Sequence, residues 1–156
     1  MAPMRIVDFE PQFAAAFKAL NEAWITHHYA LEAKDHEILG DPQAEVIDRG
    51  GAIFIAVEDD AVIGCCALKP MADGGFQLAK MTTAEAARGR GVGRALMAAC
   101  IERARARGAP RIYLESGTRL GPALALYRAF GFVDVEPPDH AATPFSRVDV
   151  WMELSL

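Results

Sequence analysis

Residues 87–96, Ala-Arg-Gly-Arg-Gly-Val-Gly-Arg-Ala-Leu, lie between a predicted strand over 76–83 and a predicted helix over about 92–107. The helix has one apolar face, formed by Val92, Leu96, Ala99, Cys100 and Ala104, which indicates packing against a sheet. The first turn of a helix has unpaired N–H groups and the positive end of the helix dipole. The alternate glycines at 89, 91 and 93 leave those groups open to an anion. The segment therefore predicts a cradle for a phosphate or pyrophosphate.

The spacing of this loop excludes two common phosphate sites. Gly89-x-Gly91 is followed three residues later by Arg94, so the dinucleotide fingerprint is absent, and no Gly-Lys-Ser/Thr follows to make a P-loop. Arg88 and Arg94 are placed to add charge-assisted hydrogen bonds to an anion. A flexible connection with solvated arginines is the alternative that the segment by itself leaves open.

The segments around the loop predict a single mixed α/β domain over residues 1–156. Strands are expected at 4–9, 52–58, 61–71, 76–83, 111–116, 132–136 and 146–154, and helices at 11–24, 25–40 (broken), 41–50, 92–107 and 122–130. Asp59-Asp60 and Asp73-Gly74-Gly75 are tight turns, so residues 52–83 form an antiparallel meander.

Composition restricts the class of protein. The net charge is 16 − 21 = −5, which argues against a nucleic-acid partner. The three cysteines, Cys65, Cys66 and Cys100, have no spaced framework, which is typical of a reducing compartment, and we expect a cytoplasmic protein without a metal. The sequence has no run of roughly 18 apolar residues, so no membrane association is expected.

Arg88-x-x-Gly91-x-Gly93 resembles the Arg/Gln-x-x-Gly-x-Gly/Ala signature of the GNAT family of N-acetyltransferases. A second stretch, residues 126–132 (Leu-Tyr-Arg-Ala-Phe-Gly-Phe), resembles the family's Leu-Tyr-x-x-x-Gly-Phe pattern, and the similarity runs over about residues 52–136. The resemblance implies a strongly twisted, mixed, mostly antiparallel sheet with a V-shaped splay, flanked by about four helices. It also leaves a homodimer open, since many relatives are dimers.

The resemblance implies acetyl-coenzyme A as the co-substrate, lying in the V. The pantetheine arm would run along Met81, Thr82 and Thr83 like an added strand. The acetyl carbonyl would meet a backbone N–H near Met81 or Thr82, as in an oxyanion hole. Contacts to the cofactor would come from the loop and from the strand after it, at Arg88, Gly89, Arg90, Gly91, Val92, Gly93, Arg94 and Ser116.

Tyr127 matches the tyrosine that protonates the departing thiolate in many members of the family. A phenol with a pKa of about 10 is protonated at neutral pH and can donate. Tyr127 also shares a helix face with Leu120, Leu124 and Phe130, so core packing is the alternative interpretation.

Three positions depart from the pattern of the family, and the least consequential is Glu85, where the family often has proline. Gly117 stands where many relatives carry asparagine, so a side-chain contact to the cofactor is expected to be missing. Gln77 stands where near relatives often carry glutamate, and an amide cannot act as a base.

An acceptor ammonium must lose a proton before its nitrogen can attack. Glu115 and Glu32 are candidate bases, and a solvated or salt-bridged carboxylate is equally compatible with each. Trp24 and His28 are expected to line the acceptor side, where Arg147 would meet a substrate carboxylate or lie on a surface strand. His28, Glu32 and His36 would share a helix face suited to a metal, but the helix is expected to be broken there.

These expectations favour an N-acetyltransferase that moves an acetyl group from acetyl-coenzyme A to a primary amine of a small molecule or amino acid, by direct attack in a ternary complex. A non-catalytic acyl-coenzyme A sensor and an enzyme that acetylates protein lysines or N-termini are the alternatives.

Overall fold

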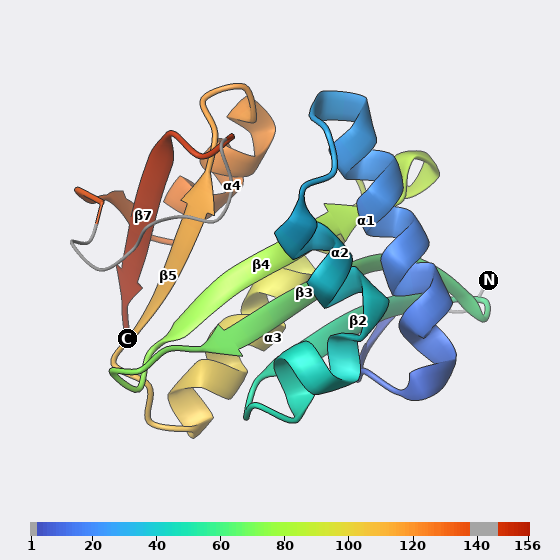
Figure 1. The fold of residues 1–156 in the computed structure, drawn as a ribbon, viewed down its shortest axis with the longest axis horizontal. Coiled ribbons are helices and arrows are strands. Elements are labelled where there is room, and N and C mark those ends of the chain that lie inside the picture. Colours follow the sequence, from blue (N-terminus) through green and yellow to red (C-terminus); the bar gives the residue numbers. More distant parts are fainter. Residues whose placement is uncertain (1–2, 138–146) are drawn as a thin grey trace.

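The computed structural model describes residues 3–137 and 147–156, which form one sheet in the strand order β1-β2-β3-β4-β5-β7-β6 with helices on both faces (Figure 1). The strands are β1 (Arg5–Asp8), β2 (Ala52–Glu58), β3 (Ala61–Pro70), β4 (Phe76–Thr83), β5 (Arg111–Ser116), β6 (Val133–Asp134) and β7 (Val150–Ser155). The helices are α1 (Ala14–His28), α2 (Ala33–Gly40), α3 (Val92–Ala106) and α4 (Gly121–Ala129), with short turns η1 (Pro11–Phe13), η2 (Gln43–Ile47) and η3 (Glu85–Ala87). No helix within these described ranges combines the length and apolar character needed to cross a bilayer.

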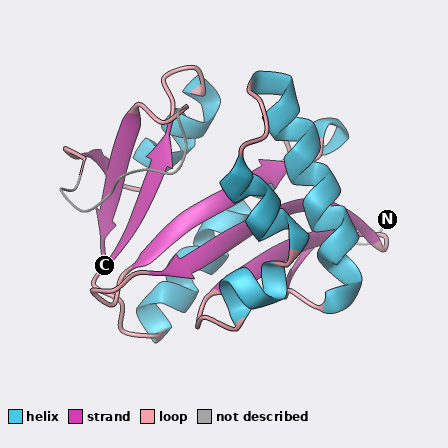
Figure 2. Ribbon diagram, viewed as in Figure 1, coloured by secondary structure: helices cyan, strands magenta, loops and turns pink. Residues whose placement is uncertain are grey.

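The sheet splays between β4 and β5, which are parallel neighbours in a mostly antiparallel arrangement. These two strands pair only where Phe76–Leu78 faces Ile112–Leu114. Beyond Leu78 they diverge, and Figure 2 shows the resulting V, with β5 and β7 on one arm and β2, β3 and β4 on the other. The predicted V-shaped splay is confirmed.

The continuous apolar run of β2 follows from burial of both faces of the sheet. Successive side chains of a strand point to opposite faces, so Phe54 joins the cluster under α3 while Ile53 and Ile55 join the cluster under α1 and α2. Each such fully buried side chain stabilises the fold by about 1.5–3 kcal/mol relative to an exposed one. This packing holds both layers of helices against the arm that carries β4.

Several predicted elements differ from the structure. Residues 43–47 form a π-helical turn rather than a regular helix. The strand predicted over 132–136 is limited to Val133–Asp134, close to Pro137, which has no N–H to donate to a ladder. The last strand begins at Val150, later than predicted, and position 146 lies outside the described residues. The break predicted in the helical region 25–40 is confirmed, because α1 ends at His28 and α2 begins at Ala33.

Candidate functional site

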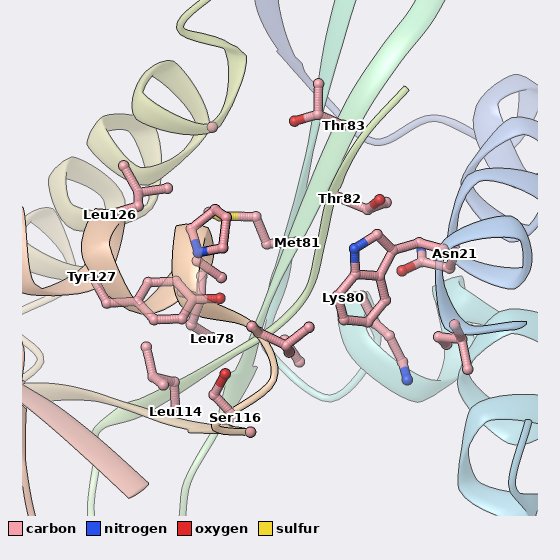
Figure 3. A pocket seen from close by; sticks show the side chains of 18 of the residues that line it. Asn21, Leu78, Lys80, Met81, Thr82, Thr83, Leu114, Ser116, Leu126 and Tyr127 are labelled. Carbon is pink, nitrogen blue, oxygen red and sulfur yellow. The ribbon is translucent and has the colours of Figure 1, made fainter. Parts of the chain in front are cut away.

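A cavity of about 690 Å³ occupies the V and extends from the first turn of α3 to the turn between α1 and α2. This volume lies within the range of small-molecule and cofactor sites, about 300–1,000 Å³. In Figure 3, Tyr127 and Leu126 lie on one side of the cavity, and Asn21, Lys80 and Thr82 lie on the other. The cavity therefore has walls from both arms of the V.

The glycine-rich loop forms the end of the cavity at α3. Gly91 is the N-cap residue of α3 and has a left-handed backbone with φ of 81°, which favours glycine. No side chain caps the helix, so the N–H groups of Val92 and its successors keep their capacity to bind a ligand. A Cβ atom built on Gly89 or Gly91 would meet nothing within 4 Å. The loop thus offers unblocked amides and the positive end of a helix dipole, which fit a pyrophosphate.

The edge of β4 forms the middle of the cavity. Its pairing with β5 stops at Leu78, so the side of Met81–Thr83 that faces away from β3 lines the cavity instead of a neighbouring strand. The β3–β4 register shifts so that Lys80 and Met81 of β4 face Cys66 alone, and Lys80, in this bulge, has a positive φ of 55°. A β-bulge redirects the groups beside it, and here it lies where the two strands part. This edge can hydrogen-bond an extended ligand.

Tyr127 reaches the cavity from α4. Its ring packs against Phe132, with ring centroids 5.9 Å apart, and its hydroxyl points toward the middle of the cavity in Figure 3. Burial, together with the neighbouring Cys66, raises the pKa of the Tyr127 phenol well above its usual value. The phenol therefore remains protonated at neutral pH and can act as a proton donor.

The opposite end of the cavity is polar and aromatic. Trp24, Tyr29, Gln77 and Glu115 contribute to its lining. The Tyr113 hydroxyl donates a hydrogen bond of 2.9 Å to Glu115 Oε2, which orients that carboxylate. Burial and the Glu115 charge raise the pKa of Tyr113, so its hydroxyl remains a donor.

A buried ion cluster adjoins this end, where two of its members, Lys80 and Arg147, line the cavity, and it joins three segments of the chain. Asp35 on α2 is fully buried and is ion-paired with Lys80 of β4. Arg147 donates to both oxygens of Asp35, at 2.8 and 2.9 Å, and to Glu32 Oε2 at 3.2 Å. Burial by itself would raise the pKa of Asp35, but hydrogen bonds from Arg147, Lys80 and the Glu32 backbone outweigh it and hold the pKa well below its usual value. Burial lowers the pKa of Lys80, an effect that the Asp35 carboxylate opposes.

Asp35→Asn is expected to lower the free energy of unfolding by about 2 kcal/mol at neutral pH, because hydrogen bonds to charged groups contribute about 1.5–3 kcal/mol each. A carboxyl whose pKa is lower in the folded state stabilises the fold above its unfolded pKa of about 3.9, and this contribution is lost as the pH falls below that value. Urea unfolding of the wild type should therefore show a loss of stability on acidification that is smaller in the variant. Asp134→Asn is the matched control, since its exposed pair with Arg128 should contribute little. Equal pH profiles for wild type and Asp35→Asn would contradict this assignment.

Most of the predicted site residues line the cavity: Trp24, Met81, Thr82, Thr83, Arg88, Gly89, Gly91, Val92, Gly93, Arg94, Glu115, Ser116, Tyr127 and Arg147. Arg90 instead pairs with Glu58. His28 and Glu32 are not among the lining residues, and Glu32 and His36 do not share a helix face with His28, because α1 ends at His28.

The sequence did not identify Asn21, Tyr29 and Lys80 as lining residues, nor Asp35 as the centre of an ion cluster. A helical spacing of four separates Asn21 from Ile25, and this was the available signal that Asn21 faces inward. Nothing local to Tyr29, Asp35 or Lys80 predicts their distant partners.

Comparison with known proteins is consistent with this geometry. The model of the acetyltransferase (GNAT) family matches residues 13–132. An IAA acetyltransferase from Azospirillum brasilense is 34% identical over 85 residues, covering 54% of this chain and 56% of that protein. The chain spans between 56% and 62% of the length of the curated relatives it matches.

Solved structures share the fold. A GNAT-family acetyltransferase from Staphylococcus aureus Mu50 superimposes with a TM-score of 0.90 at 14% identity, covering 98% of this chain and 99% of that chain. The structure of yncA from Salmonella typhimurium with its cofactor acetyl-CoA has a TM-score of 0.78 at 19% identity, covering 99% and 94%. The predicted fold is confirmed.

Proposed function

Because the chain belongs to the acetyltransferase (GNAT) family, we propose that it transfers an acetyl group from acetyl-coenzyme A to a primary amine of a small molecule or amino acid, by direct attack in a ternary complex. The observation that carries the proposal is the continuity of one cavity from the glycine-rich loop, past Tyr127, to a polar end. The two substrates would thus enter from opposite ends and meet between the arms of the V.

The cofactor half of the proposal rests on the loop and on β4. The amides at the start of α3, with Arg88 and Arg94 beside them, would hold the pyrophosphate. The free edge of Met81–Thr83 would pair with the pantetheine arm, and an N–H of this segment would stabilise the oxyanion. Acetyl-coenzyme A supplies the activated acyl group as a thioester.

The chemical step requires one proton donor and one proton acceptor. The amine nitrogen attacks the thioester carbonyl carbon, the carbon–sulfur bond breaks, and the Tyr127 hydroxyl gives its proton to the departing sulfur. Before the attack, the acceptor ammonium loses one proton to Glu115, the member of the predicted pair of carboxylates that lines the cavity, or to water. Glu32 is a weaker candidate because it pairs with Arg147 and does not line the cavity. After the attack, the nitrogen loses a second proton, which returns through water to the Tyr127 phenolate.

The preference for a small acceptor rests on the ion cluster. Arg147 precedes β7 on one arm of the V, and Asp35 of α2 and Glu32, the N-cap residue of α2, lie on the other. Their ion pairs join the arms at the acceptor end, which limits the path open to a long polypeptide. This arrangement favours a small amine over a protein acceptor.

The test is a transfer assay with labelled acetyl-coenzyme A and a panel of free amines, amino acids, amino-acid amides and peptides. We expect acetylated products from small amines, together with binding of acetyl-coenzyme A by calorimetry. Binding without transfer to any amine would favour the non-catalytic sensor, and absence of binding would contradict both.

A further inference from the structure

Tyr29 lies at the end of α1 on the arm of the V that carries β4. It is the first residue after the helix, with an extended backbone, and its N–H donates to the Ile25 carbonyl at 2.6 Å. Its ring lies near Trp24, with centroids 6.5 Å apart. The guanidinium carbons of Arg119 and Arg147 lie 5.5 and 5.9 Å from the ring centroid. Packing and cation–π contacts therefore fix the direction of this side chain.

Gly117, at the end of β5 on the other arm, is the position that Tyr29 reaches. A Cβ atom built on Gly117 would lie 2.7 Å from the Tyr29 hydroxyl oxygen and 3.4 Å from the Arg147 carbonyl oxygen. The loop cannot shift freely, because Asp149 accepts hydrogen bonds from the Thr118 N–H and hydroxyl at 2.8 and 2.9 Å. The hydroxyl of Tyr29 thus takes the space that any side chain at 117 would need.

These contacts bridge the open side of the V. Figure 1 shows the turn after α1 facing the turn between β5 and α4 across the opening. Arg119 Nη1 adds a long contact of 3.5 Å to the His28 carbonyl oxygen, from the same pair of turns. Tyr29 and Gly117 both line the cavity, so the bridge is also a wall of the acceptor end.

We propose that Tyr29, whose ring Arg147 of the ion cluster also contacts, limits the size of the acetyl acceptor together with that cluster, and that Gly117 is glycine because it must admit the Tyr29 ring. This inference rests on the proposed amine acetylation and adds a limit on the size of the acceptor. The amine must belong to a molecule small enough to fit under the contacts that Tyr29 and Arg119 make across the V. A peptide that carries the same amine would have to displace the ring from Trp24 and from both guanidinium groups.

The experiment compares two matched classes of acceptor in the full-length protein. Each amino-acid amide is paired with a longer peptide that begins with the same residue, so the reacting amine is the same and only the size differs. We expect the wild type to prefer the amides in kcat/KM. Tyr29→Ala should reduce this preference at least about tenfold, the usual scale for a change of pocket size.

Three further variants separate selection from folding. Tyr29→Phe keeps the ring and should keep the preference. Gly117→Ala should reduce the preference because the new Cβ displaces the ring, and the double variant Gly117→Ala/Tyr29→Phe should restore it, because the clashing oxygen is gone. Gly121→Ala, at the first residue of α4, is the nearby control, since a Cβ there meets nothing within 4 Å, and it should leave the preference unchanged.

Each outcome decides a different claim. If Tyr29→Ala and Gly117→Ala are active and still prefer amides over peptides, the size limit set by Tyr29 is wrong and the proposed function stands. The same follows if the wild type acetylates peptides as readily as amides. A wild type that binds acetyl-coenzyme A but transfers to no amine would overturn the proposed function, and the size limit with it. Thermal melting of each variant confirms that it is folded.

Discussion

Gly91→Val is expected to weaken binding of acetyl-coenzyme A at least about a hundredfold, which corresponds to about 2.7 kcal/mol. Gly91 is the N-cap of α3, and the direction of its absent Cβ is open. A valine side chain would therefore stand in the space proposed for the pyrophosphate and keep it away from the helix amides. Calorimetric titration of wild type and variant with acetyl-coenzyme A measures the loss.

The strain of the substitution needs its own control. Gly91 has φ of 81°, and a branched side chain in this left-handed region costs roughly 1–2 kcal/mol. Gly108, after the other end of α3, has φ of 73° and equally open surroundings but does not line the cavity. Gly108→Val should lose similar stability and retain binding. If both variants lose the same affinity, backbone strain explains the effect, and the proposed phosphate site at Gly91 is contradicted.

Tyr127→Phe is expected to lower kcat by about 10²–10³-fold and to leave the affinity for acetyl-coenzyme A unchanged, since a positioned general acid typically contributes about 10²–10⁴-fold. The variant keeps the ring that packs against Phe132, so the melting temperature should change little. Steady-state rates and calorimetry on the same preparation separate the two effects.

The pH dependence of the wild type gives a second check of the acid role. Because burial raises the pKa of Tyr127, its ionisation should not reduce kcat below about pH 10, the ordinary pKa of a phenol. If Tyr127 only packs in the core, Tyr127→Phe should leave kcat unchanged. That result would contradict the acid role and would mean that water protonates the departing thiolate.

The end of the cavity proposed for the cofactor was predictable because its parts are adjacent in the sequence. A helix start with unblocked amides is a local property of the chain. The alternate glycines before and within the first turn of the helix, at 89, 91 and 93, are therefore enough to predict it. Tyr127 was identified through a second local motif and reaches the same cavity. The boundaries of β2, β3 and β4 also followed from local alternation and turn residues, and they agree with the structure to within a residue.

The acceptor end was predicted less well because its contacts join segments far apart in the chain. Arg147 was expected to meet a substrate carboxylate or to lie on a surface strand, but its guanidinium binds Asp35, 112 residues away. His28 and Glu32 were expected to line the acceptor side, but neither is among the residues that line the cavity, and Glu32 pairs with Arg147 instead. Periodicity describes which face of an element a residue occupies and does not describe what that face meets.

The sequence by itself determined the order of the elements, the open glycine-rich start of α3 and the position of Tyr127 on α4, because each depends on neighbours within one or two helical turns. The tertiary structure alone decided that Lys80 pairs with Asp35 and that Tyr29 fills the space beside Gly117. Asp35 meets Lys80 because α2 packs on the arm that carries β4. Tyr29 meets Gly117 across the opening that β4 and β5 leave where they part after Leu78. Such long-range contacts are set by the path of the whole chain around the sheet, and no local pattern records them.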